Sequence, residues 1–520
     1  MGANAVSQNV IRNTKSNYVL VVSRVALGLV TFRLLFDRLT DEQFGFWALL
    51  WSIFGFGALL DFGFGLSVQK NVAQRSHKED WKGLNSVLST ILMLYFGIGT
   101  LVLIATWLGS GPLLQVVGIS EGNVAEFRNV FLMFGIAMAL SLPLSVFSEA
   151  LRGRQVIWRV NQWTLIGLIL NFVLLLSAIY WGWSFLTIAA NALLCLVGPN
   201  LALIYFAYRE IPQLRLSPRL FSRETMVETS KFSGISYLVM VSYMLLTKTD
   251  QLVIGGMMSA AAIAIYQPGS KLGEMFGFAT RQLAATLQPA AAHLQATGDR
   301  EGLRNLLVSG TRYSVLLATP LYLGFAFLLK PGLRLLTGLE DPSFETLVTA
   351  QILVFWAYFF IFTHNVYKRI AVMCGHEKRL MWVGIGEAAM NLSLSVLFIY
   401  WFHSVIGVAA ATAISSMVFA VCFLWRWSCQ EAGMSGMAFA RETLFGNWLG
   451  SLPLLVWLVF ARWNPWVAYE DSYILSAVVA LVGGVVGLAG IWRFTLRDEE
   501  KAIAKTKFGR VAKRFGLAKA

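Results

Sequence analysis

Six basic side chains lie inside long apolar stretches of the sequence: Arg24, Arg33, Lys248, Lys271, Arg281 and Arg312. A basic residue at the centre of a membrane helix costs about 2.5 to 3.5 kcal/mol on insertion scales, so such residues usually face a cavity or a counter-charge. A cationic cavity lowers the barrier for moving an anionic group through an apolar medium. We therefore predict that these six residues face a cavity or a counter-charge.

Arg24 lies well inside the first apolar run, and we expect it to face the cavity. The alternative is that it pairs with an acidic residue or a backbone carbonyl of a neighbouring helix. Arg33 falls on the opposite face of an ideal helix from Arg24. It also precedes Asp37 by one helical turn, so snorkelling or pairing is the alternative for this residue.

A polar stripe runs along the apolar segment 263–290. Its members share an arc of roughly 80 to 100° on an ideal helical wheel, and they are Gln267, Lys271, Glu274, Phe278, Arg281 and Gln288. We predict that the stripe lines a central cavity and that Gln267 and Gln288 help to bind the substrate. Lys271 and Glu274 are three residues apart and could instead neutralise each other.

Four carboxylates within apolar runs are candidates for binding a coupling proton or sodium ion: Asp61, Asp250, Glu274 and Glu387. Asp61 lies beside glycines that allow helices to approach closely, and it could instead be a counter-ion to Arg24 or a cap on a broken helix. Lys248 and Asp250 are two residues apart and lie on different faces. We expect one of them to face the cavity and the other to fix a helix interface.

The composition excludes an ordinary soluble protein. Of the 520 residues, 57% are hydrophobic and 13% are charged, whereas soluble domains have about 25% charged residues. The four cysteines form no C-x-x-C pair, so neither a disulfide framework nor a zinc site is indicated. We expect no metal and no other cofactor beyond a coupling ion.

Apolar runs predict an all-α polytopic membrane protein with about fourteen transmembrane helices. The runs are 17–36, 44–68, 84–108, 127–148, 162–181, 186–208, 232–254, 263–290, 305–329, 347–367, 381–401, 406–427, 447–461 and 472–494. The first lacks a cleavage signal, so we predict a retained helix. About 31 of the 42 basic residues fall on one side of this arrangement, which predicts cytoplasmic termini by the positive-inside rule. The net charge of +14 therefore sets topology, and no nucleic-acid partner is expected.

The order of the runs predicts two six-helix lobes, residues 1–220 and 221–435, then two further helices within 436–494 and a basic cytoplasmic tail from 495 to 520. The loop 209–231 is expected to act as a hinge. A shift of 219 residues pairs Asp80 with Asp299 and Gly83 with Gly302. Because each lobe has an even number of helices, the repeat would be parallel. The tail suits either a surface helix on anionic lipid or a solvated segment.

Three segments carry a resemblance to a known family: 39–47 (LTDEQFGFW), 60–65 (LDFGFG) and 69–73 (QKNVA). A similar pattern returns at 248–255 (KTDQLVIG). The chain resembles the polysaccharide-transporter (Wzx-type flippase) branch of the multidrug/oligosaccharidyl-lipid/polysaccharide (MOP) exporter superfamily. The resemblance implies a MATE-like fold in the bacterial inner membrane and alternating access.

The implied function is translocation of an undecaprenyl-pyrophosphate-linked oligosaccharide to the periplasmic leaflet, for O-antigen, capsule or exopolysaccharide synthesis. The six basic residues within the apolar runs would bind this anionic substrate, and Arg24 is the best candidate for binding its phosphates. Implied partners are this lipid-linked oligosaccharide, membrane lipids, and a polysaccharide polymerase with its chain-length machinery. Alternatives within the superfamily are a drug/cation antiporter and a lipid II flippase.

A membrane glycosyltransferase or O-antigen ligase is the alternative from another class. Short noncytoplasmic loops and the absence of Walker A, HExxH and GxSxG motifs argue against an enzyme.

Overall fold

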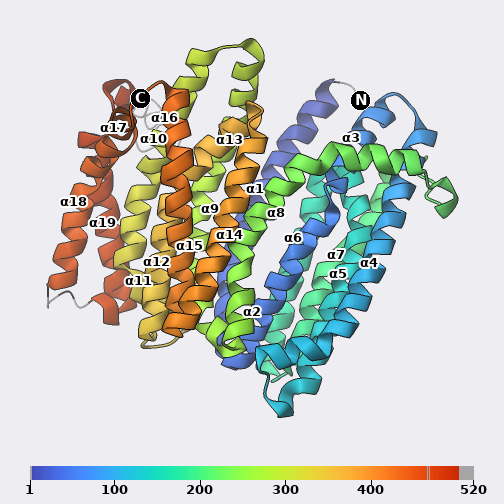
Figure 1. Cartoon of the computed structure of the whole chain (residues 1–520), viewed down its shortest axis with the longest axis horizontal. Helices are drawn as coiled ribbons and strands as arrows, with labels where there is room; N and C mark the ends of the chain where they lie inside the picture. Colours follow the sequence, from blue (N-terminus) through green and yellow to red (C-terminus); the bar gives the residue numbers. More distant parts are fainter. Residues whose placement is uncertain (1–2, 465–466, 468, 503–520) are drawn as a thin grey trace, which may run out of the picture. The chain divides into compact units, whose positions relative to one another are not determined.

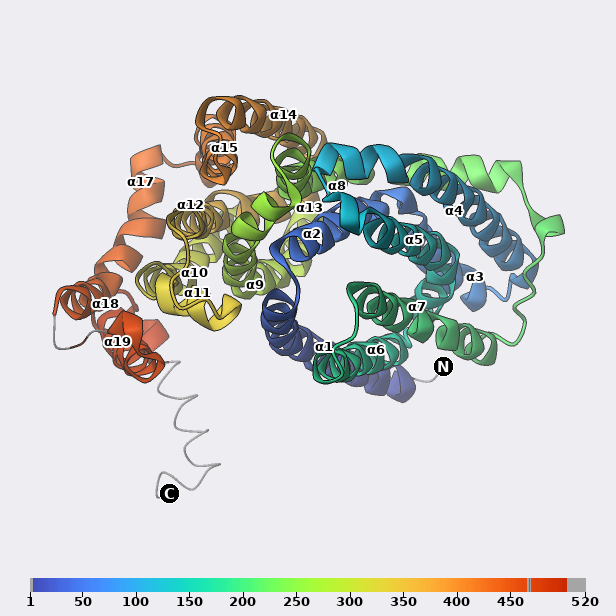
Figure 2. The same cartoon turned by 90° about the horizontal axis from the view of Figure 1, so that it is seen from below.

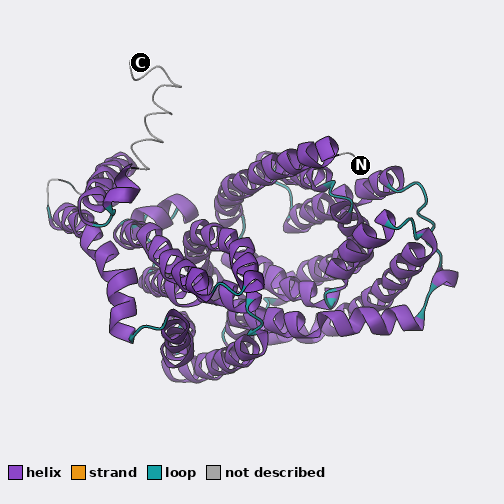
Figure 3. Cartoon of the chain, turned by 90° about the horizontal axis from the view of Figure 1, so that it is seen from above, coloured by secondary structure: helices purple, strands orange, loops and turns teal. Residues whose placement is uncertain are grey.

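The computed structural model describes residues 3–464, 467 and 469–502. Within some helices, chiefly over 228–247 and 278–296, it describes the backbone and leaves most side chains out. The part of the chain that is described consists of helices joined by loops and contains no β-strand (Figure 3). The predicted all-α fold is therefore confirmed.

Nineteen α-helices follow one another among the described residues (Figure 1). They are α1 (Ala3–Arg38), α2 (Asp41–Gly55), α3 (Phe64–His77), α4 (Trp81–Val117), α5 (Val124–Gly153), α6 (Ile157–Tyr180), α7 (Phe185–Glu210), α8 (Arg223–Met257), α9 (Ala260–Thr297), α10 (Arg300–Phe327), α11 (Leu329–Thr337), α12 (Phe344–Phe360), α13 (Val366–Met373), α14 (Glu377–Phe402), α15 (Val405–Phe419), α16 (Arg426–Ala432), α17 (Gly436–Ala440), α18 (Gly446–Trp463) and α19 (Tyr473–Phe494).

Eleven described helical segments are long and apolar enough to cross a membrane, or twelve if α10 and α11 form one span bent by 74°. The chain is a multi-pass membrane protein. The long helices α8 and α9 coincide with the predicted runs 232–254 and 263–290, but many of their side chains lie outside the described residues. The count of fourteen spans stays a prediction.

The helices pack as two compact units. The first contains residues 1–267, 336–338 and 384–411, and the second contains 268–335, 339–383 and 412–520. These units are defined by contacts between residues, whereas the predicted lobes are defined by the order of the helices along the sequence. The lobe boundaries therefore stay a prediction. In the first unit, α1, α2, α5, α6 and α7 surround a common centre (Figure 2).

The loop that was expected to act as a hinge is bound to α4. Asn85 donates to the carbonyl of Gln213 at 3.0 Å and accepts from the backbone N–H of Arg215 at 2.9 Å. Further along, the N–H of Ser217 donates to Ser89 at 3.1 Å. These bonds satisfy backbone groups that an irregular segment would otherwise leave unpaired. The loop therefore packs as part of the first unit.

Two of the residue pairs from the sequence repeat adopt the same local structure. Asp80 caps α4 by accepting from the N–H of Gly83 at 2.9 Å, and Asp299 caps α10 by accepting from the N–H of Gly302 at 2.8 Å. A Cβ at either glycine would come within 2.5 Å of the capping carboxylate. The paired glycines therefore leave room for the capping side chains.

The predicted single helix over 44–68 is interrupted. It continues from α2 into a 3₁₀ turn, Phe56–Asp61, and stops where Phe62 (φ 48°) and Gly63 (φ 76°) take left-handed conformations. The apolar composition runs through this point, so hydropathy gave no sign of the break. α3 begins directly after it and carries polar residues toward its end.

Candidate functional site

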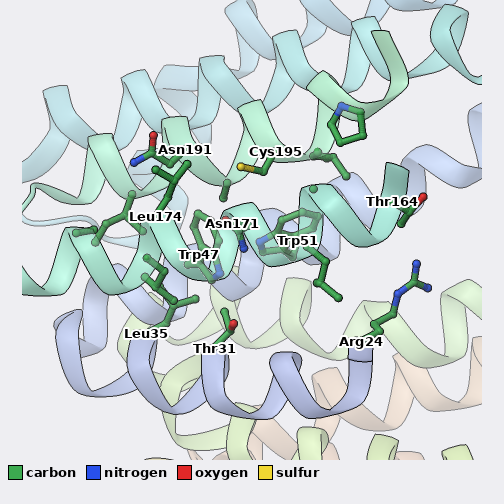
Figure 4. A pocket seen from close by; sticks show the side chains of 18 of the residues that line it. Arg24, Thr31, Leu35, Trp47, Trp51, Thr164, Asn171, Leu174, Asn191 and Cys195 are labelled. Carbon is green, nitrogen blue, oxygen red and sulfur yellow. The ribbon is translucent and has the colours of Figure 1, made fainter. Parts of the chain in front are cut away.

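A cavity of about 460 Å³ lies in the first unit between α1, α2, α6 and α7 (Figure 4). We call it the first cavity. Its lining includes Arg24, Thr31, Trp47, Trp51, Thr164, Asn171, Asn191, Cys195 and Asn200. The volume is within the range of about 300–1,000 Å³ that is typical of small-molecule sites.

The polar lining of the first cavity combines one cation with amides and hydroxyls and contains no carboxylate. Arg24 is exposed, and the structure gives it no ion-pair partner among the residues it describes. The amide nitrogen of Asn191 is buried and has no hydrogen-bond partner within the described part of the chain. An unpaired buried donor costs about 1–3 kcal/mol, so this nitrogen lowers the stability of the packing around it.

Two tryptophans of α2 are fixed in this cavity by aromatic neighbours. The rings of Trp47 and Trp51 lie 5.9 Å apart, and each packs edge-on against Phe134 of α5 at about 5.5 Å. The start of α2 is held by a capping box between Thr40 and Gln43. Trp51 keeps 38% of its surface exposed, so an indole face remains available to a ligand.

Contacts near both ends hold α1 along α6. At one end Asn13 donates to the carbonyl of Gln155 and accepts from the N–H of Trp158, both at 2.9 Å. At the other end Arg38 donates to the carbonyl of Trp183 at 3.1 Å. With α1 anchored in this way, Arg24 extends into the cavity (Figure 4).

A second cavity of about 470 Å³ adjoins the first, since Trp51 and Leu196 line both. Its polar end contains Asp61, Gln69 and Glu149. Gln69 donates a hydrogen bond to Glu149, which also lies 3.5 Å from Arg152. Asp61 accepts from the hydroxyl of the fully buried Tyr95 and, at 3.0 Å, from the N–H of Gly65.

Asp61 therefore lies at the helix break and is bound there by residues of α3 and α4. The alternative that it neutralises Arg24 is wrong, because its hydrogen bonds come from Tyr95 and Gly65. The other alternative, a cap on a glycine-broken helix, agrees with the bond to Gly65. Its role in ion coupling stays a prediction.

A buried polar network surrounds Asp250 in the first unit. Asp250 accepts from the hydroxyl of Tyr266 at 2.6 Å and from the amide of Asn391 at 3.2 Å. Asp250 thus joins α8, α9 and α14. This matches the expectation that one member of the pair Lys248 and Asp250 fixes a helix interface. Glu387, one turn before Asn391 on α14, is completely buried.

Three other predicted substrate ligands lie against other parts of the first unit. Gln267 accepts from Gln251 at 2.6 Å. Arg33 lies so close to Gly338 that a Cβ there would overlap its guanidinium group. The aliphatic part of Lys248 lies near Gly55, and its backbone carbonyl accepts from Ser52 at 2.8 Å.

In the second unit, Lys271 donates to Glu274 at 3.1 Å, as the alternative of mutual neutralisation requires. Arg312 is buried and makes two hydrogen bonds, of 2.6 and 2.8 Å, with Glu500. It also donates to the carbonyl of Thr495 at 3.0 Å. These partners give Arg312 a structural role. The side chains of Arg281 and Gln288 lie outside the described residues.

The sequence analysis missed the amides of the first cavity and the partners of Asp61. Asn171, Asn191 and Asn200 lie within apolar helices, where an amide is costly unless it finds a partner. That cost was the available signal. Nothing in the sequence, however, showed that these three amides meet Arg24 and two tryptophans in one place.

Comparisons with known proteins agree with the expected family. The family described as polysaccharide biosynthesis protein matches residues 34–340, more than half of the chain. A comparison with curated proteins gave no significant match.

Among solved structures, the chain is similar to lipid II flippase MurJ in an inward closed conformation, with a TM-score of 0.71 and 15% sequence identity. The match covers 94% of this chain and 100% of the MurJ chain. An inward-facing multidrug resistance MATE family transporter of the MOP superfamily has a TM-score of 0.65 at 17% identity, covering 81% and 99%. A MOP superfamily transporter from Pyrococcus furiosus has a TM-score of 0.51 at 16% identity, covering 82% and 96%. The predicted MOP exporter fold is confirmed.

Proposed function

The chain belongs to the polysaccharide biosynthesis protein family, and from this membership we propose that it is a flippase for a lipid-linked oligosaccharide. The substrate would be an undecaprenyl-pyrophosphate-linked glycan that moves from the cytoplasmic to the periplasmic leaflet of a bacterial inner membrane. Both termini would be cytoplasmic, and transport would use alternating access. The product would supply O-antigen, capsule or exopolysaccharide synthesis through a polymerase and its chain-length machinery.

The lining of the first cavity carries this proposal. Arg24 is its one basic residue, it is exposed, and no carboxylate lines the same cavity. A guanidinium group matches the geometry of phosphate oxygens and stays charged at all physiological pH values. The pyrophosphate would therefore bind at Arg24.

An apolar cavity in the second unit suits the isoprenoid chain. It has a volume of about 490 Å³ between α9, α10, α11, α18 and α19. Its lining is leucine-rich with a run of small residues, and it includes Leu272, Leu321, Gly324, Leu458, Gly483, Gly484 and Gly487. Because the surrounding lipid is as apolar as this lining, binding of the isoprenoid chain would depend on close packing against these side chains.

A coupling proton or sodium ion would bind at an intramembrane carboxylate. The candidates are Asp61, Asp250, Glu274 and Glu387. Asp61 lies at a broken helix and lines the second cavity, an arrangement that transporters use to bind ions. Its link to the first cavity through Trp51 would let ion binding affect the substrate site.

A drug/cation antiporter is the second candidate, favoured by the acidic end of the second cavity. The cation in the first cavity opposes it, because a cationic drug would be repelled by Arg24. A lipid II flippase would use the same anionic chemistry and differs in its glycan.

Deletion of the gene followed by analysis of carrier-linked glycans tests the proposal. We expect loss of surface polysaccharide and accumulation of an undecaprenyl-pyrophosphate oligosaccharide. In spheroplasts of the deletion strain this intermediate should remain on the cytoplasmic leaflet of the membrane. Sugar analysis of this intermediate would also identify the cargo. Normal surface polysaccharide together with increased sensitivity to cationic drugs would support the antiporter instead.

A further inference from the structure

Two arginines share one tryptophan at the predicted cytoplasmic ends of α1 and α6. The guanidinium carbons of Arg12 on α1 and Arg159 on α6 lie 3.5 and 4.2 Å from the centroid of the Trp158 ring. Arg159 also lies 4.6 Å from the ring centroid of Phe206 on α7. These cation–π contacts bring two positive charges together where α6 packs against both α1 and α7.

Hydrogen bonds fix the position of α1 at this place. Asn13, the residue after Arg12, donates to the carbonyl of Gln155 and accepts from the backbone N–H of Trp158. One turn further along, Asn161 of α6 donates to the hydroxyl of Ser16 at 3.1 Å. The first turns of α6 therefore hold this part of α1 in one register, with Arg12 over the indole.

A third arginine, Arg209, is on the same face of α7 as Phe206, three residues further along. We call Arg12, Arg159 and Arg209 the arginine cluster. None of the three is in a salt bridge within the described part of the chain, and the acidic neighbour of Arg209 is Glu210. Arg12 and Arg209 are exposed, whereas Arg159 is half-buried and its Nε is shielded from solvent.

Stacking determines what the cluster can bind. A guanidinium group stacks through its flat face, so the N–H groups at its edge remain available to the oxygens of a phosphate. The two exposed arginines provide these donors, and Arg159 adds its charge. The cluster is therefore suited to an anionic phosphate group.

Exposed apolar side chains continue from the cluster along the same three helices. Each is four or seven residues from an arginine, a spacing that puts both side chains on one helix face. The pairs are Val19 with Arg12, Ile166 with Arg159 and Tyr205 with Arg209, and Val19, Ile166 and Tyr205 are all exposed. In a multi-pass membrane protein such faces contact acyl chains. The arginines thus lie at the boundary between acyl chains and water, which is the level of lipid phosphates.

We propose that the arginine cluster binds the headgroup of an anionic phospholipid from the predicted cytoplasmic leaflet. The phosphate accepts hydrogen bonds from Arg12 and Arg209, and the acyl chains lie along the exposed apolar side chains beside them. A bound lipid of this kind would fasten α1 to α6 and α7. None of the three arginines lines the first cavity, so the site does not depend on which cargo the protein carries.

Native mass spectrometry of the purified full-length chain tests the site. The protein in detergent is mixed with equal amounts of phosphatidylglycerol and phosphatidylcholine that have the same acyl chains, and the first bound lipid is identified. We expect wild type to prefer phosphatidylglycerol at least fivefold. The double variant Arg12→Gln/Arg209→Gln should lower this preference at least threefold.

Arg223→Gln is the matched control, because it removes an exposed arginine at the start of α8, away from the cluster. It should keep the wild-type preference. The replaced arginines are exposed, and melting temperatures in detergent without added lipid check that all variants are folded. Equal binding of the two lipids to wild type, or an unchanged preference in the double variant, would overturn the site.

Two soluble anions distinguish a lipid headgroup from a free phosphate. Glycerol phosphate and inorganic diphosphate, added at the concentration of the lipid, should leave phosphatidylglycerol bound, because they lack acyl chains that pack on Val19 and Ile166. Displacement by either anion would overturn the assignment of the ligand as a lipid.

Discussion

The hydroxyl group of Tyr95 on α4 donates a hydrogen bond to the carboxylate of Asp61, at the point where the second apolar run changes direction. Tyr95 is fully buried, and Asp61 lines the second cavity. The bond therefore joins the broken helix to a rigid neighbour and fixes one oxygen of a carboxylate that faces a cavity.

Tyr95→Phe should lower the free energy of unfolding by roughly 1.5–3 kcal/mol, because a hydrogen bond to a charged group is lost. The same change in an Asp61→Asn background should cost less, since the charged acceptor is already absent. A double-mutant cycle in detergent, followed by denaturant unfolding, measures the coupling. Equal effects of Tyr95→Phe in both backgrounds would show that the two residues do not interact.

The aspartate caps that begin α4 and α10 predict a local effect on stability. Asp299→Ala should destabilise the protein by about 1 kcal/mol, because the N–H of Gly302 loses its acceptor. Asp299→Ser is the matched control, since serine also caps helices well. Thermal unfolding in detergent measures both, and a loss as large for serine as for alanine would contradict the assignment of the cap.

The sequence repeat paired Asp80 with Asp299 and Gly83 with Gly302, although it did not identify either aspartate as a helix cap. Local interactions such as Asp299 with Gly302 depend on residues three positions apart, so a repeat in sequence predicts a repeat in structure. The break at Phe62 and Gly63 was not predicted, because hydropathy is continuous across it. Arg24 was found because a charge in an apolar run is costly in any fold. Asn191 was missed because its neighbours come from distant helices.

Arg312 is a residue that the sequence singled out but whose ion-pair partner it did not predict. It was predicted to bind substrate because its charge lies within an apolar run. Its partner Glu500 is 188 residues away, in a segment predicted as a cytoplasmic tail. No pattern in the sequence pairs these two positions, and only the packing of the second unit brings them together.

The Arg312 and Glu500 pair predicts a dependence of stability on acidic pH. Hydrogen bonds from Arg312 lower the pKa of Glu500 from 4.5 to about 2. A carboxyl whose pKa is lowered in the folded state stabilises that state above its unfolded pKa, and this stabilisation is lost as pH falls through the folded pKa. The melting temperature should therefore fall between about pH 4.5 and pH 2 in wild type.

Glu500→Gln tests this assignment by removing the titrating group. The variant should be less stable than wild type near neutral pH, because Arg312 is left buried without its counter-charge. The difference between the two proteins should shrink as the pH approaches 2. A constant difference from pH 7 to pH 2 would mean that another carboxylate produces the acid sensitivity.

The apolar cavity of the second unit predicts a selective effect on long isoprenoid chains. A Cβ at Gly484 on α19 would meet nothing within 4 Å, so a larger side chain at this position can begin to fill the cavity, as in Gly484→Leu. We expect slower transport of the undecaprenyl-linked substrate and unchanged binding of geranyl pyrophosphate. Gly484→Ala is the control for backbone effects. Equal transport in wild type and Gly484→Leu would place the isoprenoid chain elsewhere.

The initial rate of flipping in proteoliposomes tests the central claim most directly. The substrate is the undecaprenyl-pyrophosphate oligosaccharide extracted from the deletion strain, and the variants are Arg24→Lys, Arg24→Glu and the control Lys15→Glu, an exposed residue of the same helix outside the first cavity. We predict a rate at least tenfold lower in Arg24→Glu, an intermediate rate in Arg24→Lys and a wild-type rate in Lys15→Glu. A wild-type rate in Arg24→Glu would contradict binding of the pyrophosphate at Arg24.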